Sequence, residues 1–449
     1  MTRLRERGWK GLKLMWACLQ LFYKSLRHVI ETVFKNDIQG LLFCVLLLVI
    51  CGCANVFSST FVEAIQSGHS VYGMAVKYAA FVLVSGVIGR WIYLHYDYTQ
   101  LRSSKIIAPI CVTILLLFIA VAVLGLDING ARRWLSVGSV SLQPSEFAKL
   151  AGVLFTAGAL ASSPWTDQRK KELLGRLIPW NVDAQQCIVS YGRAIWHVLL
   201  YALRMVLWPL IFAGITILQP DMGTASLIFA FSFTLVFLNG FPWKWIANAA
   251  VCIGLPTLVL LIIFAPYRLA RITNFVDPWA HAKEGGYQAV QSILAVGSGG
   301  ITGTGFTEGS AKFFYLPEAH TDFAFAVWSQ EWGFIGFLFV LLCFIGLGYF
   351  ALRIARSCRE PFGKFLATGA TLVILGQAFF NMWMVSGMLP VTGVPLPFIS
   401  YGGSAVFTNL MAITFICMVG KATLHRKRRE EAIAKLSPDY EYAKRHVKS

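Results

Sequence analysis

A cluster of polar side chains stands directly before one of the longest apolar runs of the chain. Residues 316–323 read Leu-Pro-Glu-Ala-His-Thr-Asp-Phe and contain Glu318, His320, Thr321 and Asp322. Ionisable groups at the mouth of a membrane-spanning segment are costly to keep there, so they are functional by default. A carboxylate at this place can titrate, bind a ligand or cap a helix. The residues alone leave these three roles of Asp322 open.

Two more polar motifs lie between the apolar runs 105–126 and 146–162. Residues 129–134 (Asn-Gly-Ala-Arg-Arg-Trp) contribute Arg133, and residues 143–146 (Gln-Pro-Ser-Glu) lead into a helix that carries Lys149. A proline followed by a serine and an acidic residue is typical of a helix start. Glu146 and Lys149, three residues apart, favour two interpretations equally: an ion pair on one helix face, or a lysine that contacts an anionic ligand.

Three loop motifs complete the set of candidates. Residues 219–224 (Gln-Pro-Asp-Met-Gly-Thr) begin with Gln219, and their aspartate and glycine are typical of a turn and helix cap. Residues 268–278 contain Arg271, whose guanidinium suits a bidentate grip on phosphate oxygens or, alternatively, on interfacial lipid phosphates. Ser400 lies in a run too rich in proline and glycine for regular helix. At membrane depth such a run must line a cavity or be covered by protein.

The elements that must position these groups are membrane-spanning helices. Of the 449 residues, 57% are hydrophobic and only 14% are charged, which is more apolar than a water-soluble protein needs. Ten apolar runs are long enough to cross a bilayer. They are 38–58, 73–93, 105–126, 146–162, 199–218, 222–240, 246–265, 323–351, 364–386 and 403–421. The predicted fold class is an all-α polytopic membrane protein of about ten transmembrane helices, with a large extracytoplasmic loop between helices 7 and 8.

The distribution of Lys and Arg predicts the side that each loop occupies. The net charge is +17, and the basic residues gather in both termini and in alternate loops, as the positive-inside rule describes for cytoplasmic segments. This pattern indicates membrane orientation and not nucleic-acid binding. It predicts three parts: a basic amphipathic cytoplasmic segment at 1–37, a ten-helix membrane domain at 38–422 and a basic cytoplasmic tail at 423–449. Asp322 then faces the outside.

Five motifs together resemble the SEDS family (shape, elongation, division and sporulation), which RodA and FtsW typify. They are residues 314–323, 129–134, 143–149, 219–224 and 393–403. The resemblance covers residues from about 38 to 422. It implies a peptidoglycan glycosyltransferase at the outer face of the bacterial inner membrane. The implied substrate is lipid II, an undecaprenyl-diphosphate-linked disaccharide-pentapeptide, and the implied partner is a class B penicillin-binding protein.

The resemblance also implies that Asp322 is the catalytic residue. An aspartate within hydrogen-bond reach of the attacking sugar 4-hydroxyl can act as its general base. The diphosphate leaving group needs positive charge. A divalent cation could share that task, but no acidic cluster in the sequence defines a metal site, so the metal stays unknown. The residues expected to bind the substrate are Arg133, Lys149, Gln219, Arg271, Glu318, His320, Thr321 and Ser400.

The sequence carries features of both the RodA-like and the FtsW-like subfamily, and two other functions compete with the enzyme. Residues 384–397 look more RodA-like, whereas the long basic N-terminal segment looks more FtsW-like, and we expect a RodA-like role in elongation over an FtsW-like role in division. The first rival is a lipid II flippase or other transporter, and the second is a non-catalytic scaffold for the penicillin-binding protein. Transporter sites usually lie at the membrane midplane between repeats. The present polar groups instead gather on one face, which favours the enzyme.

Overall fold

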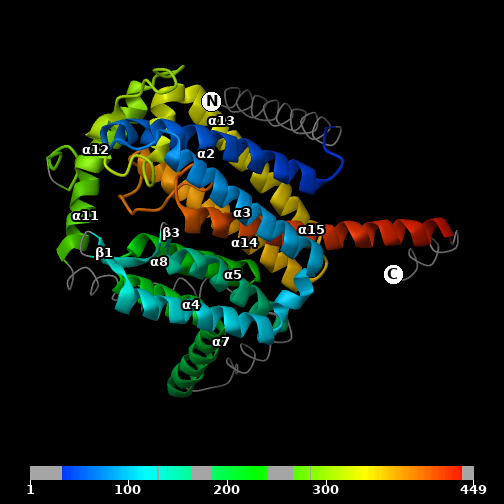
Figure 1. Ribbon diagram of the computed structural model, residues 1–449. Coiled ribbons are helices and arrows are strands. Elements are labelled where there is room, and N and C mark those ends of the chain that lie inside the picture. The colour runs from blue at the N-terminus through cyan, green and yellow to red at the C-terminus, as the bar shows by residue number, and fades with distance from the viewer. Residues whose placement is uncertain are drawn as a thin grey trace, which may run out of the picture.

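A computed structural model describes residues 33–128, 131–138, 140–163, 184–240, 266–283 and 285–436. Within them the chain forms a bundle of long helices (Figure 1). The helices are α2 (Asp37–Gln66), α3 (Gly73–His95), α4 (Ser104–Leu124), α5 (Pro144–Ser162), α7 (Ala184–Leu218), α8 (Met222–Leu238), α11 (Pro266–Val276), α12 (Tyr287–Ser298), α13 (Ala324–Ser357), α14 (Pro361–Val385) and α15 (Gly403–Leu436). Two short elements add a 3-10 turn, η1 (Tyr98–Arg102), and a π-helical turn, η3 (Ala311–Tyr315).

Seven of these helices are long and apolar enough to cross a membrane, which confirms the all-α polytopic class. They are α2, α3, α4, residues 200–218 of α7, α13, α14 and α15. Helix α5 and the shorter α8 coincide with two further predicted spans. The predicted span at 246–265 and most of the predicted amphipathic segment at 1–37 lie outside the described residues. A count of ten spans therefore stays a prediction.

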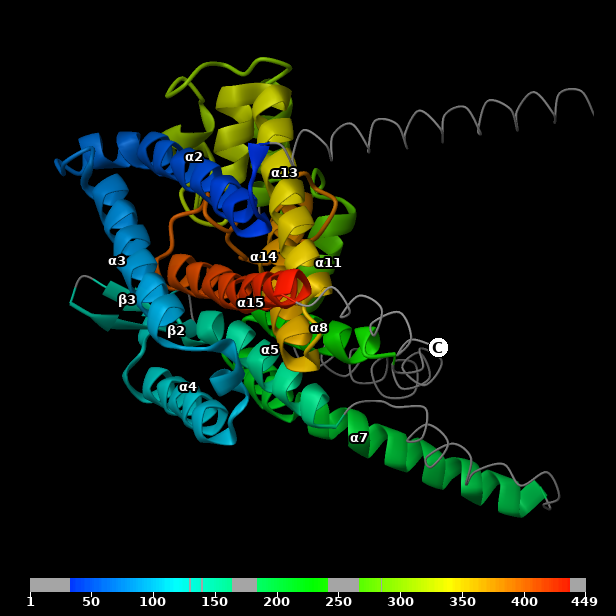
Figure 2. The ribbon, with the colours of Figure 1, turned by 90° about the vertical axis from the view of Figure 1, so that its right-hand side faces the viewer.

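The core of the bundle is built around α14 and α15. Helix α15 contacts α3, α5, α13 and α14, and α14 also contacts α5, α8 and α13 (Figure 2). Glycines allow this close approach: a Cβ at Gly369 of α14 would lie 2.3 Å from Val153 of α5, and one at Gly376 would lie 2.4 Å from Phe231 of α8. Helices in membranes use small residues in this way because van der Waals packing drives their association.

Polar connections gather at one end of the bundle. Helices α11 and α12 and a three-stranded antiparallel sheet lie at the end opposite to the one from which α15 projects (Figure 1). The sheet consists of β1 (Leu126–Ile128), β2 (Ala131–Val137) and β3 (Val140–Leu142), in the order β1-β2-β3. The sequence predicted a loop here. The strands were missed because β1 and β3 have three residues each and the seven residues of β2 do not alternate between apolar and polar. The large loop predicted before residue 322 likewise contains α11, α12 and η3.

Helix α13 is broken near its outer end. Gly333 has φ 63° and ψ −161°, so the segment 324–332 is separate from the long spanning segment that follows. Residues 299–305 dock onto the break: Phe334 N donates to Gly300 O at 2.9 Å, and Ile335 N donates to Ile301 O at 3.1 Å. These bonds satisfy amide groups that the break releases from the helix, as a low-polarity environment requires.

The opposite end carries the basic continuation of α15. This helix runs without interruption through residue 422, where the membrane domain was predicted to end, as far as Leu436. Within it Arg426 lies 3.7 Å from Glu430, which also receives a 2.9 Å contact from Arg359. Exposed pairs of this kind contribute little to stability. The predicted boundary at 423 therefore falls inside a helix.

Candidate functional site

The segment 316–323 forms a tightly wound turn before α13. The Thr321 hydroxyl donates to the Glu318 carboxylate at 2.8 Å, and the backbone N–H groups of Thr321 and Phe323 both donate to Glu318 O at 3.2 Å. Glu318 itself has φ 55°, in the left-handed region that a glutamate seldom adopts. Such strained residues persist where the surrounding structure over-determines them, often at functional sites. Glu318 and Thr321 therefore shape the turn that presents Asp322.

A second loop, residues 387–402, covers this turn and fixes its position. Tyr401 N donates to His320 O at 2.9 Å, and the rings of His320 and Tyr401 lie 6.2 Å apart. Asn381 of α14 donates through Nδ2 to Asp322 O and to Val394 O, both at 2.7 Å. One buried amide thus joins the backbone of the turn to the backbone of the covering loop.

The carboxylate of Asp322 lies against Gly393 of that loop. A Cβ placed on Gly393 would come within 3.2 Å of Asp322 Oδ2, and Gly393 has φ +72°. The backbone conformation therefore favours glycine, and a Cβ here would displace the Asp322 carboxylate by a few tenths of an ångström. Asp322 keeps part of its surface accessible. It stands two residues before the first residue of α13, a helix long and apolar enough to cross a membrane.

The surroundings of Asp322 raise its pKa from 3.8 to about 7. Burial is the largest cause, because it disfavours the charged form. The nearby carboxylates of Glu318 and Asp221, and then of Glu146, raise it further, whereas the Arg133 guanidinium lowers it. Asp322 therefore sits among carboxylates and one cation that come from four different segments. A carboxyl with a pKa near 7 is suited to take up and release protons at neutral pH.

Arg133 on β2 packs against the turn between α7 and α8. Its Nε donates to Gln219 O at 3.0 Å and its Nη2 to Pro220 O at 2.6 Å. The next residue, Asp221, caps α8 through a 3.0 Å bond from Thr224 N, as the sequence predicted. Gln219 enters the site through its main-chain carbonyl, while its side-chain Nε2 is buried without a partner among the described residues.

Lys149 is fully buried, with its charge already paired. Its Nζ donates to Glu146 Oε1 at 2.8 Å and to Gln377 Oε1 at 2.5 Å. Gln377 in turn donates to Pro395 O at 2.8 Å. The chain of bonds links α5 through α14 to the covering loop. Of the two interpretations that the sequence left open, this geometry favours the ion pair, and a substrate contact by Lys149 stays a prediction.

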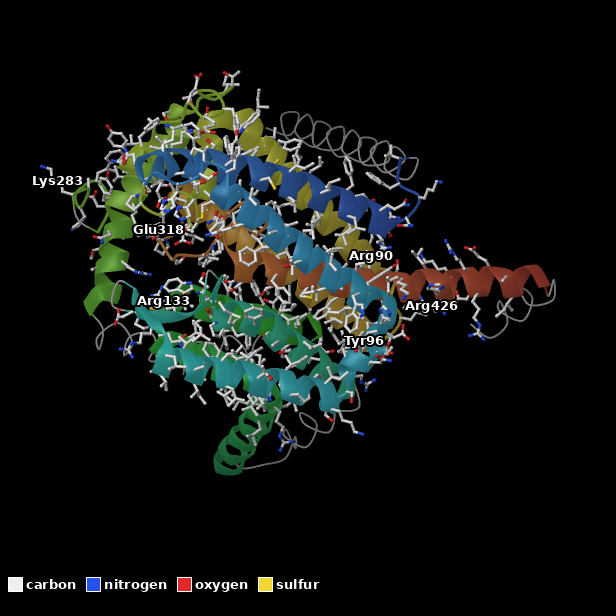
Figure 3. All side chains as sticks on the ribbon, in the orientation of Figure 1. Arg90, Tyr96, Arg133, Lys283, Glu318 and Arg426 are labelled. Atoms are coloured by element: carbon white, nitrogen blue, oxygen red, sulfur yellow. The ribbon has the colours of Figure 1, made fainter. Side chains whose placement is uncertain are left out.

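Ser400 is also used within the protein. Its hydroxyl accepts a 2.9 Å bond from Leu396 N, and the side chain is buried. It therefore closes the turn at 396–400, and direct contact with a substrate stays a prediction. Figure 3 shows Arg133 and Glu318 at the same end of the bundle, with Lys283, whereas Arg90 and Arg426 lie at the other end.

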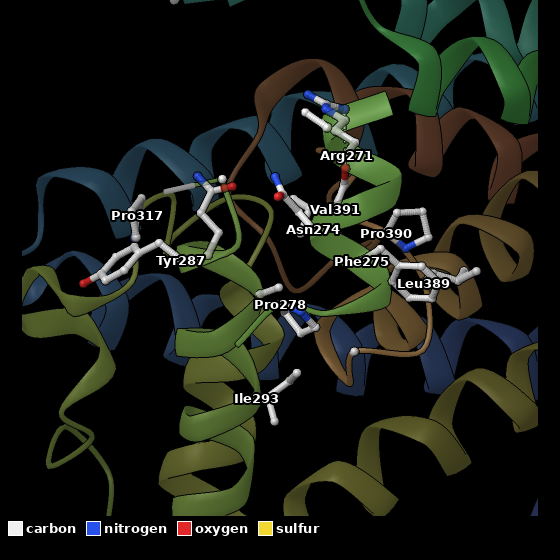
Figure 4. A pocket seen from close by; sticks show the side chains of 15 residues that line it. Arg271, Asn274, Phe275, Pro278, Tyr287, Ile293, Pro317, Leu389, Pro390 and Val391 are labelled. Carbon is white, nitrogen blue, oxygen red and sulfur yellow. Dashed lines mark hydrogen bonds between the residues drawn. The ribbon is translucent and has the colours of Figure 1, made fainter. Parts of the chain in front are cut away.

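Arg271 stands apart from Arg133, in the wall of a cavity between α11, α12 and residues 387–391 (Figure 4). Its side chain is exposed, and its Nη1 donates to Val391 O at 3.4 Å. Val391 belongs to the covering loop, two residues before the glycine that touches Asp322. The structure therefore places Arg271 beside this loop, whereas Arg133 lies against the turn at 219–220.

Sequence reasoning missed two polar groups that hold the site. Asn381 lies inside the apolar run 364–386, where a buried amide is a signal that could have been used. Lys312 of η3 and Glu331 of α13 form a buried ion pair at 2.7 Å, and Lys312 also donates to Ser58 of α2 at 2.9 Å. This pair closes a loop of chain that contains Asp322.

The side chains that the structure describes do not form a metal cage. Within the part of the chain that the structure describes, no group of three or more His, Cys, Asp or Glu side chains could hold a metal ion. Mg²⁺ is usually bound by one or two carboxylates together with substrate phosphates. Asp322 and Asp221 are of the right type for such a shared ion, so a divalent cation stays a prediction.

The chain is similar to known proteins over most of its length. The family model for the FtsW, RodA and SpoVE group, described as "Cell cycle protein", matches residues 39–425. Stage V sporulation protein E of Bacillus subtilis is 34% identical over 384 residues, covering 85% of this chain and 96% of that protein. A probable peptidoglycan glycosyltransferase FtsW of Coxiella burnetii is 37% identical over 316 residues, covering 69% of this chain and 76% of that protein.

Solved structures show the same fold. A chain in a peptidoglycan synthase complex has 26% identity and a TM-score of 0.63, covering 85% of this chain and 97% of that one. The rod shape determining protein RodA of Thermus thermophilus has 25% identity and a TM-score of 0.56, covering 85% of this chain and 96% of that one. Because the family model spans nearly all of the predicted membrane domain, the chain belongs to the FtsW, RodA and SpoVE family of cell cycle proteins.

Proposed function

We propose that this chain is a peptidoglycan glycosyltransferase that polymerises lipid II at the outer face of the plasma membrane. The observation that carries the proposal is Asp322: a partly accessible carboxyl whose surroundings raise its pKa to about 7. It is held by a strained turn and a glycine of the covering loop, at the end of the bundle that bears α11, α12 and the sheet. The names of the relatives support a polymerase of glycan strands.

In the proposed reaction Asp322 is the general base. The 4-hydroxyl of the acceptor sugar attacks the anomeric carbon of the donor, and its proton passes to the Asp322 carboxylate. The new bond joins the acceptor oxygen to that carbon, while the bond to the diphosphate oxygen breaks and its electron pair leaves with undecaprenyl diphosphate. Asp322 then returns the proton to solvent. A base with a pKa near the working pH is efficient in such transfers.

The leaving diphosphate requires cations, and Arg133 is placed to supply one. Its guanidinium has five N–H donors and uses Nε and one donor of Nη2 on the carbonyls of Gln219 and Pro220. No other described residue engages the remaining donors, which can bind phosphate oxygens in the transition state. Arg133 also acts electrostatically on Asp322, so the base and this cation share one site. A divalent cation bound by the diphosphate would add positive charge there.

The other predicted site residues fall into two groups: those that bond to the protein's own turns and loops, and Arg271, which is exposed. Glu318, His320 and Thr321 hold the turn, and Ser400 and Gln219 hold the loop and turn around it. We propose that these residues act mainly by positioning Asp322 and Arg133. Arg271 remains a candidate for direct contact with substrate because its side chain is exposed in a cavity wall.

The proposed partner is a class B penicillin-binding protein, and both termini are proposed to be cytoplasmic. A peptidoglycan synthase complex among the similar structures supports such an assembly. The lack of Lys and Arg in residues 59–72 and 387–402, on the side of Asp322, supports the orientation. A RodA-like role in elongation is proposed on residues 384–397, and depletion of the protein should then give rounded cells, whereas filaments would indicate division.

The test is polymerisation of labelled lipid II by the purified chain with its penicillin-binding partner. Asp322→Asn keeps the side-chain shape but cannot accept the proton, so glycan synthesis should fall by about 10²–10⁴-fold. Lys283→Ala, an exposed cation at the same end of the bundle, should leave synthesis unchanged and is the matched control. Normal glycan chains from Asp322→Asn would refute the assignment. Lipid II translocation into vesicles without any polymer would establish the flippase instead.

A further inference from the structure

The cavity beside the covering loop has no role in the reaction described so far. It has a volume of about 470 Å³ and lies between α11, α12 and residues 387–391 (Figure 4). This volume is within the range of pockets that hold small organic ligands. Pro317, from the strained turn, also lines it. Two segments of the lining therefore lead directly to Asp322: Pro317 is in the same turn, and residues 387–391 precede Gly393, which approaches its carboxylate.

The lining is chemically mixed and has one cation. Arg271 and Asn274 stand one helical turn apart on α11 (Figure 4), and Gln288 of α12 lines the same cavity. The rings of Phe275 and Tyr287 and several prolines make up much of the remaining wall. Among the described residues, no hydrogen bond engages the side-chain amide of Asn274 or of Gln288. These amides are therefore ready to pair with an incoming ligand.

Such a lining fits an N-acetylated sugar better than a diphosphate. A diphosphate bears at least two negative charges and is usually held by several cations or a metal. A sugar presents hydroxyl and acetamido groups, which amide side chains can both donate to and accept from. Its C–H faces are apolar and pack against aromatic rings. One guanidinium, two amides and two rings match that description.

The covering loop separates this cavity from the site of the leaving group. Residues 387–391 line the cavity, whereas the next residues turn to other neighbours. A Cβ on Gly223, at the start of α8, would lie 2.5 Å from Thr392 O, and Gly393 touches Asp322. Helix α8 begins at the turn that Arg133 holds. One loop thus meets the cavity, the start of α8 and the base in succession.

The cavity and Arg133 thus lie against different segments, which fits the geometry of a direct displacement. When a hydroxyl displaces a leaving group at an anomeric carbon, the two lie on opposite faces of the sugar ring. With the leaving diphosphate at Arg133, the attacking sugar must approach from another side of Asp322. The cavity reaches the turn of Asp322 through Pro317, and no described residue of β2 or of the 219–221 turn lines it. Resting on the proposed function, we propose that the cavity is the acceptor subsite and binds the N-acetylated disaccharide whose 4-hydroxyl attacks.

The test compares Asn274→Ala and Gln288→Ala, which remove the two amides from different helices, with Lys283→Ala as the matched control outside the cavity. The probe is a soluble tetrasaccharide of β-1,4-linked N-acetylglucosamine, with inorganic pyrophosphate as the second competitor. Loss of one hydrogen-bonding side chain should weaken inhibition of polymerisation by the tetrasaccharide about tenfold, about 1.4 kcal/mol. Inhibition by pyrophosphate should not change. The KM for lipid II should rise while kcat is kept.

Three results would overturn the proposal. They are a tetrasaccharide that does not inhibit the unaltered chain, inhibition by the tetrasaccharide that is the same in both variants, and weakened inhibition by pyrophosphate instead. Thermal unfolding of each variant shows whether it is folded. Because the two substitutions are on different helices, one folded variant is enough for the test.

Binding of the tetrasaccharide to the Asp322→Asn chain, followed by saturation-transfer NMR, separates this proposal from the proposed function. Binding there that Gln288→Ala abolishes supports the subsite whether or not Asp322 is the base. Binding that Gln288→Ala leaves intact counts against the subsite, while the polymerisation assay judges the function on its own.

Discussion

Lys149→Met tests whether the buried lysine holds the fold or touches the substrate. The substitution keeps much of the apolar side chain but removes an ammonium that bonds Glu146 at 2.8 Å and Gln377 at 2.5 Å. Glu146 would then be a buried carboxylate without a cation, and its Oε2 already has no partner among the described residues. Breaking a buried pair from one side costs about 3–5 kcal/mol. The free energy of unfolding should fall by that amount.

The matched control is the double variant Glu146→Gln with Lys149→Met. Both charges are then absent, and replacing a complete buried pair by neutral groups is often close to neutral in stability. The double variant should therefore regain most of the stability lost by the single one. Thermal unfolding in lipid nanodiscs gives the stability, and polymerisation of labelled lipid II by the same samples gives the activity.

Two outcomes would contradict this reasoning. A single variant as stable as the unaltered chain would show that the pair does not hold α5 to α14. A double variant that regains stability but makes no glycan would show that the ammonium itself is needed in the reaction. That second result would restore the substrate contact that the sequence left open for Lys149.

Three further predictions concern the turn and its supports. Because the pKa of Asp322 is about 7, synthesis should fall as the pH drops below 7. Glu318→Gln removes a neighbouring carboxylate that raises this pKa, so it should move the fall to lower pH. An unmoved pH–rate profile would contradict the assignment of Asp322 as the base. Gly393→Ala should abolish synthesis, since its Cβ would stand 3.2 Å from Asp322 Oδ2 at a φ of +72°, and an active variant with unchanged KM would refute that contact. Lys312→Met should lower thermal stability by about 3–5 kcal/mol and Lys312→Met with Glu331→Leu by less, so equal losses would argue against a structural pair.

The sequence predicted the spans well because crossing a bilayer needs about 20 apolar residues in a row, a signal that is local. It also predicted the Asp221 cap and offered the Glu146–Lys149 pair, both of which depend on neighbours three residues apart. Gln377, the other partner of Lys149, stands 228 residues away along the chain. Such a contact depends on how helices pack, and no local pattern encodes it.

The outer end was predicted least well for the same reason. The strands of the small sheet are stabilised by pairing with one another, and β1 and β3 have three residues each. Asp322 and Gly393 lie close together although they are 71 positions apart in the chain. No local sequence pattern predicts such a contact. The residue types of the site were visible in the sequence. The sequence did not show which of them hold the loops in place and which are exposed to a ligand.

The break at Gly333 has a mechanical consequence. A continuous helix would transmit any tilt of its membrane-spanning segment directly to the turn that carries Asp322. At Gly333 the backbone changes direction, and the short segment 324–332 is fastened instead to residues 299–305 and, through Lys312, to α2. Residues 299–305 also accept bonds from Phe334 and Ile335 of the long segment, so this loop braces both sides of the break. A tilt of the long segment therefore reaches the turn of Asp322 only together with residues 299–305.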